Sequence, residues 1–374
     1  MKIIADDKIP FLKGVFEPYA DIVYLPGEKI DSQSVSDADA LIVRTRTHCN
    51  QKLLEGSKVK FIVTATIGYD HIDTKWCEQN GIIWKNAEGC NSGSVKQYIA
   101  SSLAWLSVKH NFKFEDKTLG IIGVGNVGKR VMKVGEALGM RIVLNDPPLV
   151  RKSGQCGFIS LDGVMREADI ISLHVPLNID GQDKTYHLFD EKNIGKLMKN
   201  AILINASRGE VVDNQALKEA LKSYKIEAAV LDVWENEPAI DTELLSLVDL
   251  ATPHIAGYSA DGKANGTTMS VHALSNFFRL PLSEWKPNEI PVNGNLEIEI
   301  DCSGKSNDDV LREAILKTYN IEEDSKYLKS NIALFEQYRG QYPIRREFAN
   351  YKLKLFSANK ELTDKLHWLG FKIY

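Results

Sequence analysis

Cysteine is scarce in this chain, and its five copies carry no pairing pattern. Cys49, Cys77, Cys90, Cys156 and Cys302 are scattered, odd in number and without a C-x-x-C motif. A disulfide framework uses an even set of cysteines, and a zinc site uses closely spaced ligands. We therefore expect neither disulfides nor a metal site, and we expect the reducing cytoplasm as the location.

Long apolar runs and an excess of positive charge are also missing. No run approaches the roughly 18 apolar residues that span a bilayer, and Asp6 and Asp7 interrupt the start before a secretory signal could form. The 46 Lys and Arg are outnumbered by 50 Asp and Glu, which gives a net charge of −4. This balance excludes a generally basic nucleic-acid binder. We expect neither nucleic acid nor membrane as a partner, although a local cationic pocket for an anionic substrate stays possible.

What the chain does have is a series of short apolar runs that alternate with segments of helical spacing. Its 374 residues are enough for two or three domains. Strands alternating with helices are typical of a parallel α/β sheet. The first series predicts strands at 2–5, 22–25, 40–43, 61–64 and 81–84.

A second series follows a predicted long helix at 95–110. Its strands are expected at 118–122, 141–144, 170–173, 201–205, 228–231 and 249–251, which is a doubly wound pattern. A further helix is expected at 260–279. Beyond Pro281, Pro287 and Pro291 the pattern changes, with strands expected at 296–300 and 351–356 and helices at 308–319 and 362–369. We expect a separate small α+β domain from about 286 to 374.

A glycine-rich motif stands at the first turn of the second series. Gly123, Gly125 and Gly128 form a G-x-G-x-x-G between a predicted strand and a predicted helix, with Asn126 and Val127 inside it. Such a loop lets a pyrophosphate approach the backbone at a helix N-terminus. Asp146 ends the next strand, where a carboxylate accepts ribose hydroxyls and repels the extra phosphate of NADP. The pattern predicts a dinucleotide site that selects NAD.

Three later strands each end in a polar block. Arg208 follows the strand at 201–204, Glu237 lies beyond the strand at 228–231, and His254 follows the strand at 249–251. The carboxyl ends of parallel strands share one edge of a sheet, so these side chains can converge. An arginine can clamp a carboxylate, a histidine can move a proton, and a glutamate can orient the imidazole. We predict a catalytic site made of these three residues.

Together these blocks resemble the D-isomer-specific 2-hydroxyacid dehydrogenases. The resemblance covers about residues 1–280. It is carried by the glycine fingerprint at 123–128, N-x-S-R-G-x-x-V-D at 205–213, D-V-W-x-x-E-P at 232–238 and P-H-I-A-G at 253–257. It implies an α/β fold of two Rossmann-like doubly wound parallel-sheet domains. Residues 1–93 with 260–285 would form the substrate domain, and 94–259 would form the NAD-binding domain.

The resemblance also implies roles for single residues. Catalysis falls on Arg208, Glu237 and His254, and substrate contacts fall on Thr45, Thr66 and Tyr258. Position 45 is Thr where Ser would be expected, but the hydroxyl is retained. Besides the fingerprint residues, cofactor contacts fall on Asp146, Val175, Ala206, Ser207, Arg208, Asp232 and Gly257.

Four features are similar to one branch of the family, which oxidises a small phosphorylated 2-hydroxy acid. They are the start at 1–6, the segment 65–73, the continuation Gly257-Tyr258-Ser259 and the tail from 286. The similarity implies that the tail is a dimerisation domain and that the protein is a homodimer. The substrate phosphate needs cations, and Arg44 and Arg46 are the natural candidates because they flank Thr45 at a strand end.

The tail holds none of the catalytic motifs, so we expect the chemistry to need no acid or base from it. Its half-apolar strands require a covering surface, either the protein's own core or the tail of a second subunit, and the resemblance favours the second. Arg345 and Arg346 lie in a basic turn. That turn is either solvated or places one arginine on a substrate phosphate across the subunit boundary.

Two other functions stay open at this level. One is a related dehydrogenase that acts on another 2-hydroxy acid, such as phosphoglycerate or glycerate. The other is a nucleotide-sensing binding protein built on the same fold. Turnover in the presence of substrate distinguishes an enzyme from a sensor.

Overall fold

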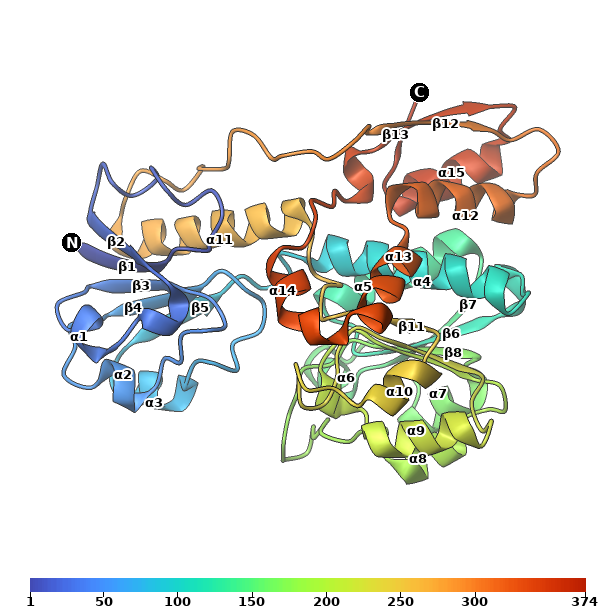
Figure 1. Cartoon of the computed structure of the whole chain (residues 1–374), viewed down its shortest axis with the longest axis horizontal. Coiled ribbons are helices and arrows are strands. Elements are labelled where there is room, and N and C mark those ends of the chain that lie inside the picture. Colours follow the sequence, from blue (N-terminus) through green and yellow to red (C-terminus); the bar gives the residue numbers. More distant parts are fainter. The chain divides into compact units, whose positions relative to one another are not determined.

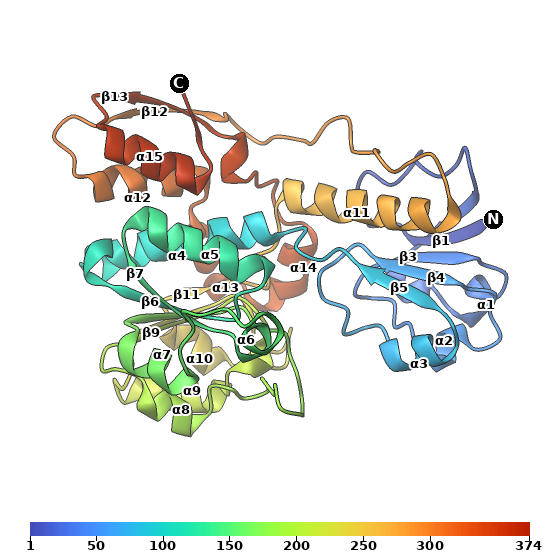
Figure 2. The ribbon, with the colours of Figure 1, turned by 180° about the vertical axis from the view of Figure 1, so that it is seen from behind.

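The computed structural model describes residues 1–374, which form two compact units. One unit contains Met1–Asn91 and Ser259–Pro291, and the other contains Ser92–Tyr258 and Val292–Tyr374. Figures 1 and 2 show the elements of both units from opposite sides. None of the helices combines the length with the apolar character that a membrane-spanning helix requires.

The first unit is built on a five-stranded parallel sheet in the order β2-β1-β3-β4-β5. Its strands are β1 (Lys2–Asp6), β2 (Asp21–Leu25), β3 (Ala40–Val43), β4 (Phe61–Thr64) and β5 (Ile83–Asn86). The long helix α11 (Ala260–Phe278) returns from far along the chain to cover one face (Figure 1). The short helices α1 (Ser32–Val35), α2 (Gln51–Leu54) and α3 (Thr74–Gln79) belong to the other face.

The strand predicted at 81–84 begins two residues later, at Ile83. Gly81 has a φ of +71°, a left-handed conformation that turns the chain after α3. Strand β5 lies at the edge of the sheet, and its side chains alternate between exposed and half-buried. The apolar run at 81–84 therefore marked the turn and the start of an edge strand together.

The second unit contains a six-stranded parallel sheet in the order β11-β10-β9-β8-β6-β7. Its strands are β6 (Thr118–Ile122), β7 (Arg141–Asn145), β8 (Ile170–Leu173), β9 (Ile202–Asn205), β10 (Ala228–Leu231) and β11 (Leu250–Ala251). A bridge between Leu144 and Phe158 adds a further parallel pairing beyond β7. The strand order reverses between β6 and β8, where doubly wound sheets bind their ligands.

Helices cover both faces of this sheet. On one side lie α4 (Ser92–Lys109) and α5 (Asn126–Leu138), whose apolar residues share a core with β6 and β9. Residues of α7 (Leu161–Glu167), α8 (Glu191–Lys196), α9 (Asn214–Lys222) and α10 (Thr242–Leu247) belong to the core on the other side. The short helix α6 (Pro147–Ser153) follows β7 directly.

The tail adds a small parallel sheet in the order β12-β13-β14. It comprises β12 (Glu297–Asp301), α12 (Asn307–Thr318), α13 (Ile321–Ser330), α14 (Phe335–Gly340), β13 (Lys352–Phe356), α15 (Lys360–Leu369) and β14 (Lys372–Ile373). Residues 320–350, where no helix or strand was predicted, contain α13 and α14.

The tail packs on the nucleotide-binding sheet's own helices. Helix α12 lies against α4, and α15 lies against α5 (Figure 2). Ile298, Ile300 and Leu353 of the tail strands belong to the same core as these helices. The expectation that a second subunit covers the apolar face of the tail is therefore wrong, because residues of the same chain already cover it.

Candidate active site

The glycine loop between β6 and α5 is shaped by close backbone contacts. Gly123 has a φ of +86°, and a Cβ atom there would lie 2.6 Å from the carbonyl oxygen of His174. A Cβ on Gly128 would lie 2.0 Å from the carbonyl oxygen of Gly123. Gly125, in contrast, is exposed and has nothing within 4 Å of its Cβ position. The loop thus leaves open space at the N-terminus of α5, which is where a pyrophosphate binds.

Asp146 connects the glycine loop to the end of β7. One carboxylate oxygen accepts a hydrogen bond from the Val124 amide at 2.7 Å, and the other accepts one from the Leu149 amide at 2.9 Å. The side chain is half-buried. A carboxylate has about four acceptor positions, so ribose hydroxyls can still bind. Val175 follows β8 and lies against Gly123, on the other side of the point where the strand order reverses.

Replacing Asp146 with Ala should weaken NAD binding and reduce the ratio of the affinity for NAD to that for NADP. Hydrogen bonds to a charged group contribute about 1.5–3 kcal/mol, which corresponds to roughly 10–100-fold in affinity. Titration with NAD and NADP measures both effects. Asp146→Asn is the matched control for shape, since it retains a capping oxygen but loses the charge. Equal use of NADP by the unmodified enzyme would contradict the role given to Asp146.

The loop after β9 carries Arg208. Asn205 fixes this loop, since its Nδ2 donates to the Arg208 carbonyl at 2.9 Å and its Oδ1 accepts from the amide and hydroxyl of Ser207. Arg208 Nη1 donates to the Ser207 carbonyl at 2.8 Å. Ala206 and Arg208 are half-buried, whereas Ser207 is buried. The loop therefore has one defined conformation, and the guanidinium of Arg208 stays partly accessible.

Gly209 brings this loop into direct contact with the one that carries Glu237. A Cβ atom at position 209 would lie 2.0 Å from the carbonyl oxygen of Trp234. No side chain tolerates such a contact, so only glycine lets the two loops approach this closely. The glycine in the N-x-S-R-G block thus has a packing reason that the sequence alone does not reveal.

Glu237 and His254 form a hydrogen-bonded pair. His254 Nδ1 donates to Glu237 Oε2 at 2.9 Å, and Glu237 Oε1 accepts the Trp234 amide at 3.0 Å. Burial alone would raise the pKa of Glu237, but its hydrogen bond to His254 and the charge of that ring outweigh burial and lower the pKa. The glutamate therefore stays ionised. Because Nδ1 is held, Nε2 is the ring nitrogen that remains for a substrate.

Asp232 organises the loop on which His254 lies. Its carboxylate accepts hydrogen bonds from the amides of Ile255 and Ala256, at 2.7 and 2.9 Å, and from the Thr252 hydroxyl at 2.7 Å. The side chain is buried, and burial raises its pKa against the opposing effects of His254 and these hydrogen bonds. Asp232 thus joins the end of β10 to the histidine loop, and its contact with a cofactor stays a prediction, as does that of half-buried Gly257.

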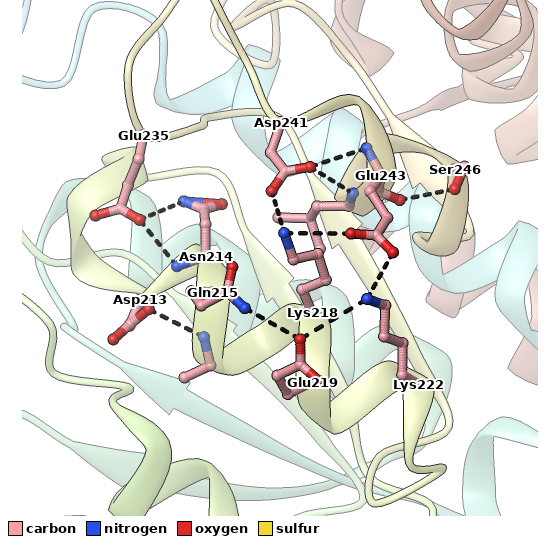
Figure 3. A network of polar contacts seen from close by, with 12 residues as sticks. Asp213, Asn214, Gln215, Lys218, Glu219, Lys222, Glu235, Asp241, Glu243 and Ser246 are labelled. Carbon is pink, nitrogen blue, oxygen red and sulfur yellow. Dashed lines mark hydrogen bonds and ion pairs between the residues drawn. The ribbon is translucent and has the colours of Figure 1, made fainter.

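A polar network anchors the Glu237 loop from outside (Figure 3). Glu235 accepts hydrogen bonds from the backbone and side-chain nitrogens of Asn214, at 2.9 and 3.1 Å. Asp241 accepts from Lys218 Nζ at 2.6 Å and caps α10 through the amides of Glu243 and Leu244. The loop is therefore tied to α9 both before and after Glu237. Sequence reasoning missed this network because its members are separated by some 20 positions.

The predicted substrate residues of the first unit lie at the carboxyl edge of its sheet. Thr45 and Arg46 are exposed and Arg44 is half-buried, directly after β3. Thr66 follows β4, where its hydroxyl lies 2.7 Å from that of Thr64 and donates to the Gly68 carbonyl at 2.9 Å. The strand order of this sheet reverses between β1 and β3, so the arginine-flanked loop lies at the position where such sheets bind ligands.

Comparisons with known proteins agree with this architecture. Residues 95–256 match the NAD-binding domain of D-isomer specific 2-hydroxyacid dehydrogenases, and residues 295–370 match a domain of unknown function. An erythronate-4-phosphate dehydrogenase of Bacteroides thetaiotaomicron is 52% identical over 94% of this chain and 99% of its own length. One from Proteus mirabilis is 40% identical over 99% of both chains. The chain belongs to the D-isomer specific 2-hydroxyacid dehydrogenase family, among the erythronate-4-phosphate dehydrogenases.

Solved structures of other dehydrogenases share the fold. D-lactate dehydrogenase from Aquifex aeolicus, complexed with NAD and lactic acid, is 26% identical with a TM-score of 0.60, over 75% of this chain and 96% of its own. NAD-bound 3-phosphoglycerate dehydrogenase from Entamoeba histolytica is 25% identical with a TM-score of 0.61, over 78% of this chain and 99% of its own. The protein is thus an NAD-dependent dehydrogenase.

The residues present fit NAD. Gly125 leaves open space at the N-terminus of α5, whose dipole favours the pyrophosphate of a dinucleotide. The carboxylate of Asp146, at the end of the next strand, can accept hydrogen bonds from the ribose hydroxyls. Asn126 is exposed and Val127 half-buried in the first turn of α5. When bound, NAD supplies a nicotinamide that accepts a hydride.

The prediction of an exposed basic turn at Arg345 and Arg346 is wrong. Arg345 is only 5% exposed and Arg346 only 8%. Arg345 Nη2 donates to the Ser94 hydroxyl and to the Ala256 carbonyl, at 2.6 and 2.7 Å, and its guanidinium lies 4.3 Å from the centre of the Tyr319 ring. Arg346 Nη2 donates to Asn350 Oδ1 at 2.8 Å. Both side chains contact residues of their own subunit, so they do not form a solvated turn, and a contact with a phosphate across a subunit boundary stays a prediction.

Proposed function

We propose that this dehydrogenase oxidises 4-phospho-D-erythronate to 2-oxo-3-hydroxy-4-phosphobutanoate, a step of pyridoxal phosphate biosynthesis. The observation that carries the proposal is the 40–52% identity to erythronate-4-phosphate dehydrogenases over at least 93% of this chain, tail included. The solved structures of D-lactate dehydrogenase and 3-phosphoglycerate dehydrogenase cover only 75% and 78% of it. The geometry of the three candidate catalytic residues supports the same reaction.

In this proposal the fork of Arg208 binds the C1 carboxylate and the C2 oxygen through paired hydrogen bonds. His254 Nε2 takes the proton of the C2 hydroxyl as C2 is oxidised to a carbonyl carbon. NAD, which the glycine loop and Asp146 would hold, would supply the acceptor for the C2 hydride. Glu237, held ionised, stabilises the imidazolium that results. In the reverse direction the protonated His254 returns the proton to the oxygen.

We assign recognition of the remaining substrate groups to Thr45, Thr66 and Tyr258. Recognition of the phosphate is assigned to Arg44 and Arg46. The residues from the first unit are grouped at one sheet edge, two of them exposed. Cations at this edge suit a substrate that carries both a carboxylate and a phosphate. Cytoplasmic location is part of the same proposal and is supported by five cysteines that are all free thiols.

A substrate panel tests the proposal. NAD reduction is followed with D-erythronate 4-phosphate, 3-phosphoglycerate and glycerate under identical conditions. We expect kcat/KM to be highest for erythronate 4-phosphate, because only it has both the phosphate and the four-carbon length. A higher kcat/KM for 3-phosphoglycerate would contradict the proposal and indicate another branch of the family. Binding of NAD without turnover of any acid would indicate a nucleotide-sensing protein.

We also propose that the protein is a homodimer that associates through the tail. Two large apolar side chains of the tail, Phe356 on β13 and Tyr374 at the chain end, are 45% and 62% exposed. Strand β12 is an edge of the tail sheet, with backbone groups that can pair with another strand. A twofold association of such surfaces is the commonest form of oligomer.

Light scattering on a variant with both Phe356→Glu and Tyr374→Glu tests the dimer. We expect the mass to fall from that of two chains to that of one, because buried like charges would face each other across the interface. Glu284→Gln, a substitution outside the tail, is the control. A dimeric mass in the double variant would contradict association through this surface. Truncation of the tail is unsuitable, since it would expose the apolar faces of α4 and α5.

A further inference from the structure

The tail contacts the loop that carries His254. Arg339 on α14 donates from Nε to the Tyr258 hydroxyl at 3.1 Å, and its guanidinium lies 5.9 Å from the centre of the Tyr258 ring. The side chain is 20% exposed, and Nη1 is 3.7 Å from Glu336 Oε1, beyond hydrogen-bond distance. Arg339 is therefore directed at a residue four positions beyond His254.

A buried cluster holds the segment around Arg339 in place. Asp324 of α13 accepts hydrogen bonds from the hydroxyls of Tyr319, Tyr338 and Tyr342, at 2.7, 2.5 and 2.6 Å. Asp324 is only 7% exposed. Three phenol donors to one buried carboxylate fix α13, α14 and the following residues relative to each other. These hydrogen bonds thus hold the segment that carries Arg339 in one position.

The same segment of the tail also forms hydrogen bonds with the loop that carries His254 through Arg345. Arg345 donates to the carbonyls of Ile255 and Ala256, at 3.2 and 2.7 Å. These two residues directly follow His254, and their amides bind Asp232. The loop is therefore held between Asp232 on one side and tail arginines on the other.

Arg339 also acts electrostatically on the catalytic pair. Burial alone would lower its pKa, but the neighbouring Tyr258 and Glu237 outweigh burial and raise it, so the guanidinium stays charged. Conversely, the charge of Arg339 contributes to the lowered pKa of Glu237, after the larger effects of burial, which opposes it, and of His254. The arginine is thus close enough to both groups to affect their charge.

We propose that Arg339 is a positioning residue for the dehydrogenase reaction, which holds the Tyr258 hydroxyl in the orientation that meets the substrate. The tail then completes the catalytic site of its own subunit, although it supplies no acid or base to the chemistry. The proposal rests on the proposed function in one respect, the contact of Tyr258 with the substrate.

A double-mutant cycle of Tyr258→Phe, Arg339→Met and the combined variant tests the proposal. Each single substitution should raise the KM for the acid by about tenfold, because one charge-assisted hydrogen bond is lost. kcat should change by less than about threefold, since neither group moves the proton. The combined variant should be no worse than the worse single variant, because Arg339 acts through the Tyr258 hydroxyl. Effects that multiply, or an unchanged KM in Arg339→Met, would overturn the proposal.

Controls separate positioning from stability. Lys326→Gln removes an exposed cation from α13, where its side chain is 69% exposed, and should leave KM unchanged. The thermal midpoint and NAD affinity should be the same in all variants. If Arg339→Met lowers the midpoint, Arg339→Lys takes its place in the cycle, because it keeps the charge with a shorter reach.

The cycle is measured with whichever 2-hydroxy acid the unmodified enzyme oxidises best. A wrong substrate assignment would therefore appear in the unmodified enzyme, and a wrong role for Arg339 only in the variants.

Discussion

Replacement of His254 by Ala should lower turnover by about 10²–10⁴-fold while NAD still binds. Loss of a general base typically has this effect, and no other ionisable ring is hydrogen-bonded to Glu237. NAD affinity should persist, since the glycine loop and Asp146 hold their own contacts without the histidine. Stopped-flow or steady-state assays of NADH formation give the turnover rate, and fluorescence titration gives the affinity for NAD.

His367→Ala is the matched control for this variant, since His367 is an exposed histidine on α15. Its turnover should equal that of the unmodified enzyme. Glu237→Gln should lie between the two, because His254 keeps its place but loses the negative charge that stabilises its protonated form. Near-normal turnover in His254→Ala would refute the assignment of the base.

Replacement of Arg208 by Lys should lower kcat/KM by about 10²–10⁴-fold. The ammonium keeps the charge but loses the planar fork, and two hydrogen bonds to charged oxygens at about 1.5–3 kcal/mol each account for a loss of this size. The fold should be unaffected, since Asn205 holds the loop through the backbone of Arg208 rather than its side chain.

Arg166→Lys is the control for this arginine substitution, because Arg166 is an exposed residue of α7. Saturation curves with the acid at fixed NAD separate the effects on KM and kcat. If Arg208→Lys keeps a normal kcat/KM, the guanidinium cannot be the group that binds the substrate carboxylate.

The nucleotide-binding sheet was predictable because its strands are buried on both faces. Such strands appear in the sequence as continuous apolar runs, and the run at 118–122 coincides with β6. The polar residues that end these strands could be assigned to one sheet edge for the same reason. Arg208, Glu237 and His254 follow β9, β10 and β11, which are adjacent in the sheet. Their roles in catalysis stay predictions until the variants are measured.

The tail was less predictable because its stability comes from partners that are distant in the sequence. Arg345 looks like part of a solvated turn until Ser94, Ala256 and the ring of Tyr319 are brought around it. Asp324 follows two other acidic residues in the sequence, yet it is buried and accepts hydrogen bonds from three tyrosine hydroxyls. No spacing rule links these positions, so Arg339 and its contact with Tyr258 could not be inferred from the sequence.

Isotope transfer from a labelled substrate tests the central claim most directly. The enzyme is supplied with NAD and D-erythronate 4-phosphate that carries deuterium at C2, and the reduced cofactor is examined by mass spectrometry and NMR. We expect one deuterium at C4 of the nicotinamide and a 2-oxo product without label. Unlabelled NADH, or no NADH at all, would show that the protein does not transfer a hydride from C2 of this acid.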